Sequence, residues 1–178
     1  MEPSVNARLE TERLILEPQA VAHAPEVFKA LQDPSLYTYI ASPPPQDLEA
    51  LSARFQQLES RRSPDGKVHW LNWVLVERQS GGLVGKIDAS LEATGQAEFG
   101  CILFSPGRGF ATEALVVVLP HLARMGATHF RATVTVGNHA SRRVLEKLGF
   151  HLNAVLPGND MIRGQVVDDW EFLRDAQP

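Results

Sequence analysis

The spacing of hydrophobic positions in the first third of the chain predicts one strand followed by two helices. Residues 13–16, Arg-Leu-Ile-Leu, follow a polar segment and alternate enough to predict a β-strand that ends at Pro18. Apolar side chains then recur every three or four residues over 23–32 and over 47–61, which is the period of an amphipathic helix. Pro25 falls in the first turn of the earlier helix, where its missing N–H leaves no hydrogen bond unmade.

The middle of the chain is rich in β-branched and aromatic residues and predicts three strands. They cover residues 69–77, 82–92 and 97–104, and the turn-forming sequence "RQSGG" separates the first two. Strands joined by such short turns are expected to pair as an antiparallel meander.

The remainder of the chain alternates helical and extended patterns. It predicts helices over 111–125 and 139–148 and strands over 129–136, 150–156 and 165–173. Pro120 lies inside the first of these helices and is expected to kink it. The whole order predicts a mixed α/β fold, with helices on both faces of a mostly antiparallel sheet. Because no repeat or linker interrupts it, residues 1–178 are expected to form a single domain.

Composition restricts the classes of protein to which this chain can belong. Its 178 residues, 44% hydrophobic and 21% charged, suffice for one sizeable core. The formal net charge of −4 gives no electrostatic reason to bind nucleic acid and favours a cationic substrate instead. The longest apolar stretch, "ALVVVLPHLA", is too short to cross a bilayer, and the N-terminus lacks the pattern of a signal peptide. No membrane association is therefore expected.

Cysteine usage fits a reducing cytoplasm. Cys101 is the single cysteine, so neither an internal disulfide nor a metal cluster is expected. Because side chains alternate along a strand, Cys101 should face away from Glu98 and pack in the core.

Residues 105–114, "SPGRGFATEA", combine a glycine-rich turn with the start of a helix. Gly107 and Gly109 have no Cβ, so the backbone can turn sharply there and approach a ligand closely. The N–H groups of residues 107–112 would then point outward at the positive end of the helix dipole, with the charge of Arg108 beside them. This arrangement favours an anion such as a pyrophosphate, and the alternative is an ordinary strand-to-helix turn. The residues after the second glycine do not match a P-loop.

Three segments together resemble one known family. They are "LETERLIL" at 9–16, "GRGFATEAL" at 107–115 and "VGNHASRRVLEKLGF" at 136–150. In this order and spacing they resemble the GNAT superfamily of acetyl-CoA-dependent N-acetyltransferases, most closely its RimJ/RimL-like branch. The resemblance spans nearly the whole chain. It implies a sheet splayed at the cofactor site, acetyl-CoA as acetyl donor and a primary amine as acceptor.

The resemblance also implies which residues bind the cofactor. The turn at 107–112 matches the family's pyrophosphate-binding motif, and the strand at 102–104 would pair with the pantetheine arm. Asn138 matches a cofactor-contacting asparagine, and Ser141 lies where the branch often has a serine near the cofactor sulfur. The positions carried over in this way are Ile102, Leu103, Phe104, Gly107, Arg108, Gly109, Phe110, Ala111, Thr112, Asn138, Ser141, Arg142 and Arg143.

Thioester chemistry suggests the catalytic residues. Many family members carry a tyrosine, the proton donor to the leaving thiolate, where this chain has Leu145. Because a thiol with a pKa around 8.5 leaves tolerably without full protonation, a hydrogen bond from Ser141 would suffice. Glu98 begins the strand that leads to the cofactor turn, and it is the first candidate for the base that removes the amine proton.

Other interpretations of these residues stay open. Asp88 is the second candidate base, and His69 or His151 the third. Glu98 is equally consistent with an exposed glutamate at a strand end. Asn138 stands just before a helix, where an N-cap role alone would explain an asparagine.

The sequence does not name the acceptor. An α-amine of pKa 7.7–8.0 is neutral in about one molecule in ten at pH 7, and a lysine in about one in a thousand, which favours a protein N-terminus. The alternatives are a small amine, such as an antibiotic or amino acid, and a catalytically silent acetyl-CoA-binding sensor. Contacts to the acceptor are expected from residues 33–46 and 60–70, and the protein is expected to be a monomer or homodimer.

Overall fold

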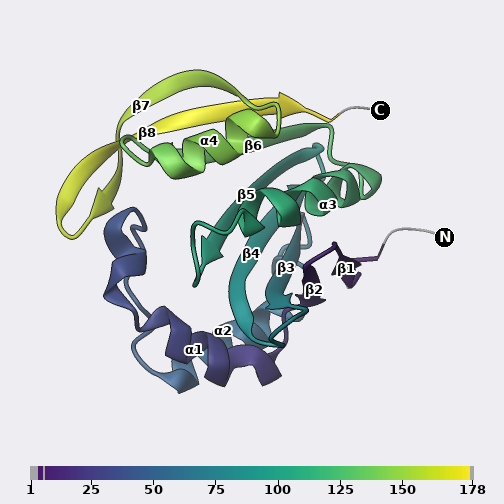
Figure 1. The fold of residues 1–178 in the computed structure, drawn as a ribbon. Helices are drawn as coiled ribbons and strands as arrows, with labels where there is room; N and C mark the ends of the chain where they lie inside the picture. The colour runs from purple at the N-terminus through teal and green to yellow at the C-terminus, as the bar shows by residue number, and fades with distance from the viewer. Residues whose placement is uncertain (1–3, 6, 177–178) are drawn as a thin grey trace.

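One sheet connects the N-terminal strands of this protein to its C-terminal strands. The computed structural model describes residues 4–5 and 7–176, and its eight strands lie in the order β1-β2-β3-β4-β5-β6-β8-β7 (Figure 1). The strands are β1 (Leu9–Glu10), β2 (Leu14–Pro18), β3 (Val68–Glu77), β4 (Leu83–Glu92), β5 (Gln96–Leu103), β6 (His129–Thr135), β7 (His151–Ile162) and β8 (Gln165–Asp175). Neighbours pair antiparallel except β5 and β6, which are parallel. The predicted mixed α/β fold with a mostly antiparallel sheet is confirmed.

Helices cover both faces of the sheet, as predicted. They are α1 (Ala24–Leu31), α2 (Leu48–Leu58), α3 (Phe110–Arg124) and α4 (His139–Lys147), with short 3-10 helices at Val21–His23 and Pro34–Thr38. Val74 of β3 packs with α1 and α2, whereas Leu71 and Leu75 pack with α3. Leu145 of α4 belongs to the same cluster as α3. We call the two sides of the sheet the α2 face and the α3 face.

Strands β5 and β6 pair over only three positions and then part. The pairs are Gln96 with His129, Ala97 with Phe130 and Glu98 with Arg131. Beyond Glu98, β5 stays paired with β4 while β6 stays paired with β8, so the sheet opens between its two halves (Figure 1). The splay implied by the family resemblance is therefore present, with Glu98 and Arg131 at its vertex.

The C-terminal hairpin is longer than the sequence predicted. The stretches expected at 150–156 and 165–173 are strands of 12 and 11 residues. A register shift between Leu156 and Asp160 lets β7 continue past a proline and a glycine that resemble a turn in sequence. The actual turn lies between Ile162 and Gln165, where both intervening residues have positive φ.

Three short elements were not predicted from the pattern of the chain, one of which is the 3-10 helix at Val21–His23. Strand β1 has two residues, too few for any periodicity. The 3-10 helix at Pro34–Thr38 starts after Asp33, whose carboxylate accepts a hydrogen bond from the Ser35 N–H over 2.9 Å. Helix α3 continues through the exposed Pro120. Among the helices of the described residues, none is long and apolar enough to cross a membrane.

Candidate active site

The glycine-rich turn between β5 and α3 is shaped to bind an anion. Gly107 and Gly109 have φ values of +86° and +80°, in the left-handed region that favours glycine. No side chain caps α3, and within the described chain the N–H groups of residues 107–112 donate no hydrogen bond. These amides lie at the positive end of a 15-residue helix, which fits a phosphate group. Phe110 is fully buried, so only its backbone can contribute.

Arg13 ties the start of α3 to β2. Its Nε donates to Glu113 Oε2 over 2.7 Å and its backbone N–H donates to Glu113 Oε1 over 2.9 Å. The Thr11 hydroxyl donates to the same Oε1, and Arg13 Nη1 donates to the carbonyl of Arg108 over 3.1 Å. Burial raises the pKa of Glu113, but the hydrogen bonds from Thr11 and Arg13 outweigh it and hold that pKa below its ordinary value. We call Thr11, Arg13 and Glu113 the loop clamp.

Sequence reasoning did not single out the loop clamp. Its members do lie inside two of the quoted segments, "LETERLIL" and "GRGFATEAL", so the family resemblance was the signal that could have found them. The clamp connects these two segments in space, because it fixes the turn at 107–112 to the second strand.

The Arg108 side chain is engaged by Glu77 at the end of β3. The two form an ion pair, and Arg108 also lies over the Phe110 ring, 4.5 Å from its centroid. Hydrogen bonds from Arg108 and then Ser80 hold the pKa of Glu77 below its ordinary value. Because Glu77 shares the charge of Arg108, an anion at this turn would be held mainly by backbone amides.

The start of α4 brings Asn138 and Ser141 together. Asn138 Oδ1 accepts a hydrogen bond from the Ser141 backbone N–H over 3.2 Å, so the N-cap interpretation is confirmed. The Ser141 hydroxyl makes no hydrogen bond to the part of the chain that the structure describes. The Tyr39 hydroxyl donates to the carbonyl of Gly137 over 3.3 Å, which brings the segment 33–46 to this helix start.

The two arginines of α4 differ in their surroundings. Arg142 pairs with Glu146 over 2.7 Å and lies over the Trp170 ring, 5.0 Å from its centroid. Arg143 is exposed and pairs with no carboxylate among the described residues. Leu145, which stands where the family often has a tyrosine, is 4% exposed and packs in the core.

Beyond the vertex, β5 offers a free backbone edge. Residues 102–104 bond to β4 on one side, while pairing with β6 has already ended. Gly85 of β4 approaches so closely that a Cβ there would lie 2.5 Å from the carbonyl oxygen of Ile102. The free edge is where the resemblance places the pantetheine arm.

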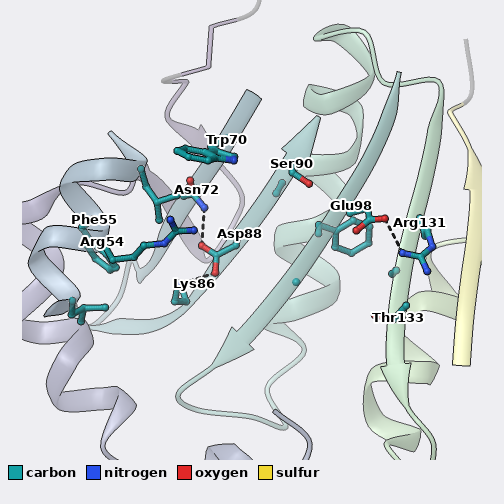
Figure 2. A pocket seen from close by; sticks show the side chains of 16 residues that line it. Arg54, Phe55, Trp70, Asn72, Lys86, Asp88, Ser90, Glu98, Arg131 and Thr133 are labelled. Atoms are coloured by element: carbon teal, nitrogen blue, oxygen red, sulfur yellow. Dashed lines mark hydrogen bonds and ion pairs between the residues drawn. The ribbon is translucent and has the colours of Figure 1, made fainter. Parts of the chain in front are cut away.

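A cavity of about 410 Å³ lies on the α2 face of strands β3 to β6 (Figure 2). It is lined by Leu51, Arg54, Phe55, Leu58, Trp70, Asn72, Lys86, Asp88, Ala89, Ser90, Glu98, Phe99, Gly100, Arg131, Ala132 and Thr133. The first two candidate bases, Glu98 and Asp88, therefore line one cavity, and neither histidine candidate lines it. Gly100 and Thr133 lie on the two diverging strands, so the cavity reaches the splay.

Glu98 is held at the vertex by hydrogen bonds to one of its oxygens. Its Oε1 accepts from Arg131 Nη1 over 2.8 Å (Figure 2). The same oxygen accepts from Gln96 Nε2 over 3.1 Å. Arg131 Nε also donates to Glu171 of β8 over 2.6 Å, and this bond holds the pKa of Glu171 below its ordinary value. Three strands are thus joined at the point where the sheet opens.

Asp88 is held by two neighbours on the same face. Asn72 Nδ2 donates to Asp88 Oδ1 over 2.8 Å, and the Lys86 ammonium pairs with the other carboxylate oxygen (Figure 2). Because the amide nitrogen of Asn72 faces the carboxylate, its Oδ1 is directed elsewhere. That buried oxygen has no hydrogen-bond partner within residues 4–5 and 7–176.

Cys101 lies on the opposite face of β5 from Glu98, as predicted, and packs against the core. Burial raises the pKa of its thiol to about 12, and the negative charge of Asp88 adds to the shift. The thiol therefore stays protonated at neutral pH and is a poor nucleophile.

The turn at 107–112 follows β5, and the polar cavity lies along the same strand where it parts from β6. This layout is the one expected of a transferase, which has to bring an anionic donor and a second substrate together. Residues 13–151 match the family model of the Acetyltransferase (GNAT) domain, and the chain belongs to this family. It is an N-acetyltransferase that uses acetyl-CoA, as the resemblance implied.

Known relatives are similar over most of their length. The chain is 25% identical over 153 residues to the uncharacterized N-acetyltransferase YoaA of Bacillus subtilis (strain 168), covering 83% of this chain and 85% of that protein. The RimL ribosomal L7/L12 alpha-N-protein acetyltransferase in complex with coenzyme A matches with a TM-score of 0.80 at 19% identity, over 93% of this chain and 95% of that one. The ribosomal-protein-S5-alanine acetyltransferase of Vibrio fischeri matches with a TM-score of 0.84 at 16% identity, over 97% and 100%. These structures share the fold of this protein.

Proposed function

We propose that this protein acetylates the α-amine of a protein N-terminus in the cytoplasm. The observation that carries the proposal is the cavity of the α2 face, which reaches the splay and has Glu98 in its lining. An α-amine is neutral about a hundred times more often than a lysine side chain at pH 7, so a weaker general base is enough to deprotonate it. Two enzymes of the same fold are named for N-terminal or alanine acetylation of ribosomal proteins, which supports the same acceptor class here.

The glycine-rich turn and its surroundings fit the donor. The N–H groups of residues 107–112 would hold the diphosphate of acetyl-CoA, and the exposed Arg143 would add a positive charge. The free edge at 102–104 would orient the arm that carries the thioester. Acetyl-CoA supplies an activated acetyl group whose thiolate is a fair leaving group.

Two side chains are proposed to assist the reaction, one as a general base and one as a hydrogen-bond donor. Glu98 would accept the proton of the acceptor amine through Oε2, because Oε1 is already shared by Arg131 and Gln96. The hydroxyl of Ser141 would donate a hydrogen bond at the leaving sulfur, in place of the tyrosine that Leu145 replaces. Asn138 would hold the Ser141 backbone in place.

A panel of acceptors tests the proposal. The protein would be incubated with acetyl-CoA and short peptides with a free N-terminus, the same peptides with a blocked N-terminus and one lysine, and small amines. Thiol release and the mass of the product would be measured. We expect acetylation at the free α-amine. Preferred acetylation of lysine or of a small amine would overturn the proposal, and absence of thiol release above background with every acceptor would favour a silent acetyl-CoA-binding protein.

A further inference from the structure

The charged side chains of the cavity are unevenly distributed. At the vertex, two carboxylates share one guanidinium, because Arg131 binds both Glu98 and Glu171. Glu171 does not line the cavity, but its charge lies within one hydrogen bond of a residue that does. The vertex end of the cavity therefore carries an excess of one negative charge.

The opposite end, between α2 and β3, carries an excess of positive charge. Arg54 of α2 lies over the Trp70 ring, 5.6 Å from its centroid, and donates to Gln57 over 2.7 Å. It pairs with no carboxylate in the described part of the chain. The other cation of this region, Lys86, is already paired with Asp88. Arg54 is thus the uncompensated cation of the lining (Figure 2).

Asn72 also lines the cavity. It is 4% exposed, its Nδ2 donates to Asp88, and its buried Oδ1 has no partner in the described chain. Asn72 is neutral and adds no charge to either end, so the charge difference within the cavity comes from the vertex carboxylates and Arg54.

From this charge separation we propose that the acceptor is dipolar, with an amine at the vertex and a carboxylate against Arg54. The inference rests on the proposed α-amine acceptor and adds the second recognition group. An arginine stacked on an aromatic ring is well suited to a carboxylate, because its planar fork can donate two parallel hydrogen bonds.

The spacing of the sheet sets where the carboxylate lies in the acceptor. Glu98 is on β5 and Trp70 is on β3, two strands away, and two strand spacings amount to about 10 Å. An extended peptide advances about 3.3–3.6 Å per residue. The acidic side chain is therefore expected at the second or third residue of the acceptor.

Matched peptides test the inference. Four peptides with a free N-terminus and an amidated C-terminus would carry aspartate at position three, asparagine at position three, aspartate at position six or asparagine at position six. We expect kcat/KM about tenfold higher for aspartate than for asparagine at position three, and equal values at position six. The preference should shrink with added salt.

Variants connect the preference to Arg54. In Arg54→Gln the ratio between the two position-three peptides should fall to about one, and Arg54→Lys should restore part of it. Arg62→Gln is the matched control, because it removes the same charge from an exposed arginine that does not line the cavity, and it should keep the wild-type ratio.

The outcomes separate the two proposals. Equal kcat/KM for the position-three peptides, or an unchanged ratio in Arg54→Gln, shows that the acceptor is not recognised as a dipole while α-amine acetylation stands. Absence of acetylation of every peptide overturns the N-terminal acceptor and the dipolar peptide together.

Discussion

Arg131 donates a hydrogen bond from Nη1 to Oε1 of Glu98 over 2.8 Å, at the last position where β5 and β6 pair. The bond gives Glu98 a structural role in addition to its proposed role as a general base. It joins the two strands where they begin to part, and Glu171 extends the connection to β8. Any substitution of Glu98 therefore has to separate loss of a base from loss of a structural contact.

We expect Glu98→Gln to lower kcat/KM by about 10²–10⁴-fold at pH 7, the range for loss of a general base. The deficit should shrink as pH approaches 10, because the acceptor amine is then neutral without help. Glu171→Gln is the control, since it weakens the same Arg131 network without removing the proposed base. Steady-state kinetics from pH 6 to 10 would decide, and equal losses with the same pH profile in both variants would mean that Glu98 acts only as a structural contact.

Gly109→Val should weaken acetyl-CoA binding by roughly 10–100-fold. Gly109 has φ +80° at the start of α3, and holding a β-branched residue there costs about 1–3 kcal/mol of strain, which the loop can relieve by leaving the binding conformation. Gly164→Val is the matched control, because Gly164 has φ +78° in the turn between β7 and β8 and an added Cβ there meets nothing within 4 Å. Calorimetry on both variants, each checked for folding by thermal unfolding, measures the effect. The same affinity in folded Gly109→Val and wild type would remove the loop from the cofactor site.

Ser141→Ala should lower kcat by about tenfold, with little dependence on pH and no change in acetyl-CoA affinity. The cap of α4 uses the backbone N–H of Ser141, so this variant removes the hydroxyl and leaves the cap intact. Asn138→Ala removes the cap of α4 and keeps the Ser141 hydroxyl, and it should reduce the free energy of unfolding by about 1 kcal/mol. Wild-type kcat in Ser141→Ala would leave the residue with no role beyond the start of its helix.

Glu113→Gln should loosen the loop clamp, reduce the free energy of unfolding by about 1–3 kcal/mol and raise the Kd for acetyl-CoA. The clamp also predicts a pH dependence of stability. Folding lowers the pKa of Glu113, through hydrogen bonds that outweigh its burial, and lowers the pKa of Glu77 through Arg108.

As pH falls, the unfolded chain therefore takes up protons at these two sites before the folded protein does. Their contribution to stability is complete above about pH 5 and is lost as the pH drops through their lowered folded-state pKa values. Urea unfolding between pH 7 and pH 3 should show this decline, and it should be shallower in Glu113→Gln. If the free energy of unfolding of Glu113→Gln falls with pH as steeply as that of the wild type, Glu113 does not contribute to the pH dependence of stability.

The order of the main helices and strands follows from local sequence patterns, because hydrophobic period, prolines and capping residues act over a few neighbouring positions. The α2 pattern over 47–61, the cap at Asn138 and the left-handed turn at Gly107 and Gly109 were all predictable in this way. The length of β7 was not, because its bulge depends on pairing with β8.

Which charged side chains pair with one another depends on the folded arrangement of the chain. Arg13 and Glu113 are 100 residues apart in sequence, Arg108 and Glu77 are 31 apart, and Glu98 and Arg131 are 33 apart. Each pair depends on strand register and on the splay of the sheet, which no local pattern encodes. Arg54 remains without a carboxylate partner in the described chain for the same reason. The other charges of the cavity are paired, Glu98 with the distant Arg131 and Lys86 with Asp88 on the same strand, which leaves Arg54 free to meet a substrate.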